Sequence, residues 1–203
     1  IGPNINLALV PEVKERSTTL IVFDRSGSMQ TMGDEPIQSI NMFIKEQQLS
    51  ASDDDTLSLY LFSDTIIKKL NQIPVNKVEP LKEFSCYGMT SLNDAIGCAI
   101  DEHLSLHNVV CVIVTDGFEN SSKKYTTNRI KEKVKEMENL MGWLFIYLAA
   151  NQDSVAVGSK LGISCCSNYE QSTPGDLLNI IRETSGTVTS YHQSQRKVSN
   201  GKY

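Results

Sequence analysis

Three short segments of the chain place oxygen-bearing side chains next to glycine. Residues 24–29 read Asp-Arg-Ser-Gly-Ser-Met, so one carboxylate and two hydroxyls stand at alternating positions. Residues 87–91 read Tyr-Gly-Met-Thr-Ser, and residues 115–117 read Thr-Asp-Gly. Carboxylate and hydroxyl oxygens are ligands that the hard cation Mg²⁺ prefers, and Mn²⁺ accepts the same set. Brought together, these segments predict a cation site that needs no His or Cys.

Apolar strands alternate with amphipathic helices along the chain, and these elements must position the three segments. Strands are expected at 19–23, 56–62, 65–70, 109–114, 143–149 and 163–166. Helices are expected at 35–49, 92–106, 123–140 and 155–161, and from a capping box at Thr173 and Asp176 to about 194. The tight link at residues 63–64 favours an antiparallel hairpin. The pattern predicts an α/β, Rossmann-like, doubly wound sheet that is mostly parallel, with one antiparallel edge strand and helices on both faces.

The expected topology also places the three segments relative to one another. In open α/β sheets, ligands bind beyond the carboxyl ends of the strands. Residues 24–29 and 115–117 directly follow expected strands, and residues 87–91 directly precede an expected helix. We therefore expect all three segments at one edge of the sheet.

The motifs DRSGSM after a hydrophobic strand, GMTSLNDA before a helix and VTDG after a later strand resemble the von Willebrand factor A (vWA) family. The resemblance runs from about Thr18 to Ile163, with the motifs in the family's order. The segment AANQD at residues 149–153 resembles cytoplasmic bacterial or phage-type members of the family. Asn151 or Asp153 could line the rim of the site, although capping of the following helix is the favoured role for Asp153.

In the vWA family, the three loops form a metal-ion-dependent adhesion site (MIDAS). The resemblance implies that Mg²⁺, or Mn²⁺ in its place, is held by Asp24, Ser26, Ser28, Thr90 and Asp116. The hydroxyls would bind the ion directly, and the aspartates often act through water. The open coordination position would take a Glu or Asp from a partner protein. This implies a protein-interaction module that is not an enzyme.

Composition and charge limit the other classes of partner. The net charge of −5 leaves no basic excess to neutralise phosphates, so we expect no nucleic-acid partner. No run approaches the ~20 apolar residues of a membrane helix, so we expect no membrane insertion. The five cysteines lack CxxC spacing and are expected to be free thiols, which favours a cytoplasmic location. The expected organisation is an N-terminal extension at 1–17, a vWA-like domain at 18–193 and a flexible tail at 194–203.

Other functions remain open from the sequence. Haloacid-dehalogenase-like phosphohydrolases also carry an Asp after a hydrophobic strand, but they use Asp-x-Asp, and Ser26 stands where the second acid would be. A metal-free scaffold is a further alternative. His103 and His107 are four residues apart but lack the Glu of a zinc HExxH motif, so we expect surface or helix-end histidines.

Overall fold

The computed structural model describes residues 16–150 and 153–200, with side chains described up to residue 197. A single six-stranded sheet has the strand order β3-β2-β1-β4-β5-β6. Its strands are β1 (Thr18–Asp24), β2 (Thr56–Phe62), β3 (Ile66–Pro74), β4 (Val109–Thr115), β5 (Leu144–Ala150) and β6 (Cys165–Tyr169). Every neighbouring pair is parallel except β2 with β3.

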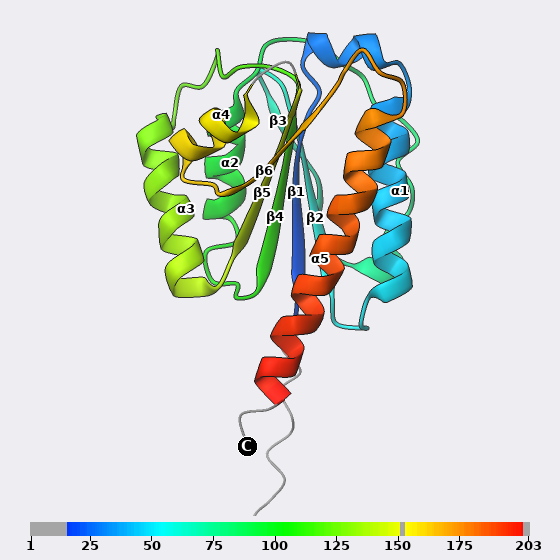
Figure 1. The fold of residues 1–203 in the computed structure, drawn as a ribbon, viewed down its shortest axis with the longest axis vertical. Coiled ribbons are helices and arrows are strands. Elements are labelled where there is room, and N and C mark those ends of the chain that lie inside the picture. Colours follow the sequence, from blue (N-terminus) through cyan, green and yellow to red (C-terminus); the bar gives the residue numbers. More distant parts are fainter. Residues whose placement is uncertain (1–15, 151–152, 201–203) are drawn as a thin grey trace, which may run out of the picture.

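Helices cover both faces of this sheet (Figure 1). The α-helices are α1 (Glu35–Ser50), α2 (Leu92–Asp101), α3 (Thr127–Met141), α4 (Ser154–Leu161) and α5 (Asp176–Asn200). Two short 3-10 helices are η1 (Gly27–Met32) and η2 (Val75–Lys77). Helices α2, α3 and α4 lie on one face, and α1 and α5 lie on the other. The predicted fold class, with its single antiparallel edge strand, is confirmed.

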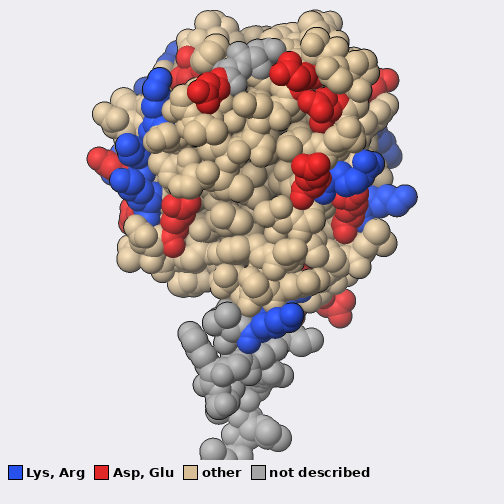
Figure 2. All heavy atoms as spheres, in the orientation of Figure 1, with Lys and Arg blue, Asp and Glu red and all other residues tan. Residues whose placement is uncertain are grey.

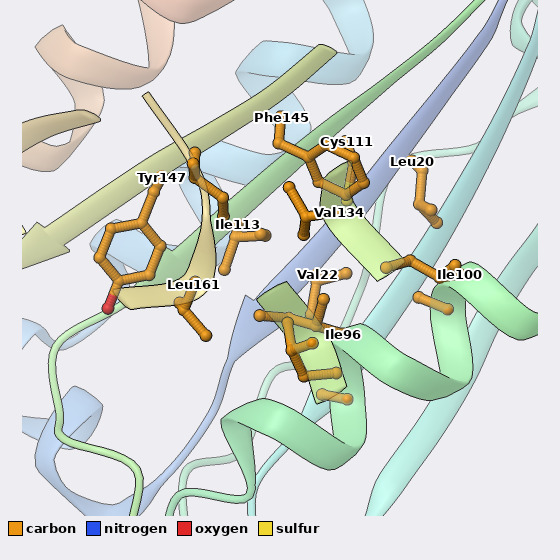
Figure 3. Close-up of a cluster of buried hydrophobic side chains, with 14 of the residues drawn as sticks. Leu20, Val22, Ile96, Ile100, Cys111, Ile113, Val134, Phe145, Tyr147 and Leu161 are labelled. Atoms are coloured by element: carbon orange, nitrogen blue, oxygen red, sulfur yellow. The ribbon is translucent and has the colours of Figure 1, made fainter. Parts of the chain in front are cut away.

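The central strands alternate their side chains between two hydrophobic cores. Leu20 and Val22 of β1 point into the core beneath α2, α3 and α4, which also holds Cys111 and Phe145 (Figure 3). Ile21 of β1 points into the opposite core, against α1 and α5. Burial on both faces explains why β1, β4 and β5 are nearly continuous apolar runs. The carboxyl ends of these strands therefore form a rigid edge.

Helix α2 is shorter than the sequence pattern predicts, and His103, which follows it, is buried rather than exposed. The helix ends at Asp101, and residues 102–105 form turns. His103 is buried, with Nδ1 2.8 Å from the carbonyl oxygen of Ala99 and Nε2 2.9 Å from the hydroxyl of Ser58. His103 therefore lies at the end of α2, which is one of the two predicted positions, but it is not on the surface, because a strand hydroxyl and a helix carbonyl satisfy both of its ring nitrogens. His107 is exposed, as predicted.

The start of α5 is capped from another helix rather than by the predicted Thr173 capping box. The carboxylate of Glu35, the first residue of α1, accepts hydrogen bonds from Gly175 N at 3.1 Å and Leu178 N at 3.2 Å. Asp176 instead accepts a hydrogen bond from Glu170 N at 2.6 Å. An acid supplied from α1 satisfies these amides, so the local Thr-Asp pattern was misleading.

The domain boundaries can be compared only in part. Residues 1–15, most of the predicted N-terminal extension, lie outside the described residues. At the other end, α5 continues to Asn200, so the residues from 194 to 200 that we expected in a tail are helical. All five cysteines are free thiols, and Cys111 is buried in the sheet. No helix within residues 16–150 and 153–200 is long and apolar enough to cross a membrane.

Candidate metal centre

The first loop of the site is fixed by the carboxylate that ends β1. Asp24 is buried, and its Oδ1 accepts a hydrogen bond from Ser26 N at 2.7 Å. Its Oδ2 accepts a hydrogen bond from the hydroxyl of Thr115, the last residue of β4, at 2.6 Å. Arg25 N donates to the carbonyl of Phe62 at the end of β2 at 2.7 Å. The loop is thus held against the ends of both strands that flank β1.

The second loop is held to the first and third loops through its backbone. Gly27 N donates to Gly88 O at 3.1 Å, which joins the second loop to the first. Thr90 N donates to the side chain of Asn120 at 2.9 Å, and Asn120 N donates back to Thr90 O at 3.0 Å. Gly88 has a φ of +76°, a backbone conformation that residues with a Cβ rarely adopt, so glycine is favoured at this position. Thr90 is thereby set in place.

The third loop brings its carboxylate to the two serine hydroxyls. Ser28 Oγ donates to Asp116 Oδ1 at 2.7 Å and lies 3.2 Å from Ser26 Oγ. A Cβ placed on Gly117 would lie 3.0 Å from Thr90 Oγ1 and 3.9 Å from Ser28 Oγ. These two hydroxyls therefore lie against the same glycine. The structure brings together all five residues that the sequence predicts as ligands.

Access to this cluster is one-sided. Asp24, Ser26, Thr90 and Asp116 are buried, whereas Ser28 is exposed. The cluster lies at the carboxyl edge of the sheet, at the end of the molecule opposite the C-terminal end of α5 (Figure 1). An ion held here would be enclosed by protein on most sides and would still meet a ligand from outside.

Burial makes the two carboxylates costly to ionise. It raises the pKa of Asp24 to about 6, against hydrogen bonds from Thr115 and Ser26 that lower it. Burial also raises the pKa of Asp116, and a hydrogen bond from Ser28 opposes that shift. Among the described ion pairs, none includes Asp24. The neighbouring Arg25 places its guanidinium 4.2 Å from the centre of the Tyr87 ring, where it forms a cation–π contact. A bound cation would supply the positively charged partner that none of the described ion pairs gives to Asp24.

The donor set fits a small hard cation better than a soft one. Within the described part of the chain, no three His, Cys, Asp or Glu side chains gather in a metal-binding cluster. The site therefore depends on the hydroxyls of Ser26, Ser28 and Thr90 beside two carboxylates. Such an all-oxygen set suits Mg²⁺ or Mn²⁺, and soft metals prefer thiolate or imidazole.

One polar residue at the site was not found by sequence reasoning. Gln171, in the loop between β6 and α5, places Nε2 2.9 Å from Asp116 Oδ2, 2.9 Å from Ser28 O and 2.7 Å from Thr31 Oγ1. It thus orients the carboxylate of the third loop and the backbone of the first. The only available signal was its position just after the last strand. Thr115, whose hydroxyl donates a hydrogen bond to Asp24, belongs to the VTDG motif, but the motif alone did not predict this role.

Of the two residues considered for the rim of the site, the structure describes Asp153 but not Asn151. Asp153 caps α4, because its Oδ1 accepts hydrogen bonds from Val155 N at 3.1 Å and Ala156 N at 3.0 Å. The favoured role for this residue is therefore confirmed. Asn151 lies outside the described residues.

Comparisons with known proteins identify the fold. No family model and no curated protein matches the sequence. Proximal thread matrix protein 1 from the mussel byssus, solved with a zinc-occupied MIDAS motif, is 16% identical with a TM-score of 0.60, covering 87% of this chain and 45% of that one. A von Willebrand factor type A protein from Catenulispora acidiphila is 11% identical with a TM-score of 0.61, covering 86% of this chain and 43% of that one.

A third solved structure matches over nearly its whole length. The vWF domain of the pilus tip protein Mfa5 from Porphyromonas gingivalis is 8% identical with a TM-score of 0.62, covering 88% of this chain and 96% of that one. The chain spans less than half the length of the first two structures. At these identities the likeness concerns the fold, which is that of vWA domains.

Proposed function

We propose that this vWA-fold chain is a divalent-cation-dependent protein-interaction module. Mg²⁺, or Mn²⁺ in its place, would be held by Asp24, Ser26, Ser28, Thr90 and Asp116. The observation that carries the proposal is the convergence of these five side chains from three distant loops, around a buried carboxylate with no described ion pair. The zinc-occupied MIDAS of the mussel protein, which shares the fold, supports it.

The residues of the site divide into two roles. The hydroxyls of Ser26, Ser28 and Thr90 are neutral ligands, so they leave most of the charge of the ion available. Asp24 and Asp116 orient the serines through hydrogen bonds. The ion would supply a strong positive charge, which attracts a carboxylate of the partner. The proposed partner is therefore a protein that presents a Glu or Asp.

The surface beside the site supports a protein partner. Three large side chains close to the ligands in sequence are exposed: Tyr87 at 46%, Met89 at 52% and Phe118 at 61%. Met89 directly precedes Thr90, and Phe118 follows Asp116 by two residues. Apolar side chains grouped around a polar centre are typical of protein interfaces.

Catalysis is not part of the proposal. The hydrolase alternative needs a second acid where Ser26 stands, and the described site has no histidine to act as a general base. His103 is buried beneath β2, and His192 is buried beside Thr19 on β1. We also propose a cytoplasmic location, which the five free thiols support.

A two-part binding experiment tests the proposed function. Mg²⁺ should raise the thermal unfolding temperature of the protein, and Ser26→Ala combined with Ser28→Ala should abolish the rise. A blocked glycine-aspartate-glycine peptide should then shift the amide NMR signals of the three loops in MgCl₂ but not in EDTA. Equal shifts in both buffers, or a melting temperature indifferent to Mg²⁺, would contradict the proposal. Phosphatase activity lost in Asp24→Asn would favour the hydrolase instead.

A further inference from the structure

An open groove of about 360 Å³ lies directly beside the candidate metal centre. Its lining residues come from η1, from the start of α1 and from the loop between β6 and α5: Thr31, Met32, Glu35, Gln171, Ser172 and Pro174. Gln171 belongs to both places, since its amide bonds Asp116 in the metal centre and the hydroxyl of Thr31 in the groove. A ligand bound at the metal centre would therefore reach the groove past a single side chain.

Glu35 is the charged residue among those that line this groove, and the chain segments on either side of the lining residues carry further acids but no basic residues. Residues 27–38 and 169–179 include Asp34, Glu35, Glu170 and Asp176, and they contain no Lys or Arg. Asp34 and Glu170 are exposed. In Figure 2, a group of acidic side chains without adjacent basic ones lies at the upper right of the molecule. The carboxylate of Glu35 is held in place by two backbone amides of the α5 N-terminus.

We propose that the groove binds a Lys or Arg side chain of the same partner segment that gives its carboxylate to the metal. This inference rests on the proposed function. Met32 and Pro174 offer apolar surface for the aliphatic stem of such a side chain, and the acidic residues attract its charged end. We place the basic residue two positions from the acid, about 7 Å along an extended segment, because Gln171 borders both the metal centre and the groove. A second acid at that position would be repelled.

The proposed partner motif differs from a general acidic ligand because it carries a negative group for the metal centre and a positive group for the groove. The metal centre selects a negative group, and the groove selects a positive one. The protein as a whole carries a net charge of −5, so it does not attract acidic peptides by its overall field. The order of charges in the partner is therefore the predicted specificity.

Three blocked peptides test the inference in MgCl₂ by NMR titration. The first contains aspartate, glycine and lysine in succession, the second has glutamine in place of lysine, and the third has asparagine in place of aspartate. At low ionic strength the lysine peptide should bind on the order of fivefold more tightly than the glutamine peptide. That preference should shrink at high salt, because exposed charges are screened.

Matched variants locate the effect in the groove. Asp34→Asn combined with Glu170→Gln removes two exposed charges from the residues that directly precede Glu35 and Gln171 of the lining, and Asp34 makes no side-chain capping bond to α1. Glu132→Gln combined with Glu136→Gln removes the same charge from the exposed face of α3. The groove pair should abolish most of the preference for lysine, and the α3 pair should keep it.

The outcomes separate this inference from the function on which it rests. If the asparagine peptide binds as well as the aspartate peptide, the metal–carboxylate function fails. If binding needs aspartate and Mg²⁺ but lysine and glutamine peptides bind equally, the function stands and the groove inference is refuted. The inference is also refuted if both charge-removal pairs weaken the preference equally, because the effect would then come from net charge alone.

Discussion

Replacing Asp24 with asparagine should stabilise the metal-free protein while removing its response to Mg²⁺. Asp24 is buried among hydrogen-bond donors but has no described ion pair, so its charge is costly without a cation. Asparagine keeps an oxygen to accept the hydrogen bond from Ser26 N. Its amide can donate to the hydroxyl of Thr115, which can turn to accept. The substitution therefore removes the charge and keeps the packing.

The size of this effect follows from the pKa of Asp24. Burial raises that pKa from 3.8 to about 6 in the folded protein. A raised carboxyl pKa stabilises the fold fully below pH 3.8, and this contribution is lost as the pH rises through about 6. The shift corresponds to about 3 kcal/mol of stability lost at neutral pH. Since asparagine does not reproduce every bond, we expect Asp24→Asn to gain about 1–3 kcal/mol at pH 7.5 in EDTA.

Urea unfolding of both proteins at several pH values measures this difference. In EDTA the gain of Asp24→Asn should be present at pH 7.5 and should vanish near pH 4. In Mg²⁺ at a hundred times its dissociation constant, the parent should gain about 2.7 kcal/mol and the variant little. Asp34→Asn, at an exposed position, is the control and should change neither quantity.

Two results would refute this reasoning. One is a variant less stable than the parent at pH 7.5 in EDTA, which would mean that the carboxylate is well compensated without metal. The other is an unchanged Mg²⁺ response in the variant, which would mean that the ion binds elsewhere.

Three further predictions concern other parts of the molecule. Burial lowers the pKa of His192 from 6.5 to about 4. The contribution of this histidine to stability is therefore complete above pH 6.5 and is lost as the pH falls towards 4. In urea unfolding, His192→Gln should remove about 3 kcal/mol of that pH dependence. Gly97→Ala should destabilise the fold by about 1–3 kcal/mol, because its Cβ would lie 2.5 Å from the Tyr125 ring. Gly186→Ala, which meets nothing within 4 Å, should instead stabilise α5 by up to about 1 kcal/mol, and opposite melting shifts of this pair would check both. Gln171→Ala should weaken Mg²⁺ affinity about tenfold by calorimetry, because it frees Asp116 from its orienting hydrogen bond; an unchanged affinity would contradict that role.

The fold could be predicted because its signals are local. Strands such as Thr18–Asp24 are buried on both faces and read as continuous apolar runs, and the helices between them show an apolar stripe. The three loops of the candidate site could be predicted for the same reason: each is a short motif attached to the end of a strand or the start of a helix. Their convergence then followed from a parallel sheet.

The features that were missed depend on contacts between distant segments. Gln171 is an ordinary loop residue until the fold places it against Asp116. Glu35 caps α5 from the start of α1, so a local capping motif could not reveal it. The buried position of His103 requires the hydroxyl of Ser58 from another element. No pattern within a single segment encodes these pairings.

The most direct measurement of the central claim is a crystal structure of the protein soaked in MnCl₂, with anomalous diffraction recorded at the manganese edge. We expect one strong anomalous peak within bonding distance of the hydroxyls of Ser26, Ser28 and Thr90, with Asp24 and Asp116 beside it. Well-ordered loops without a peak at that position would contradict the assignment of these residues as a metal centre.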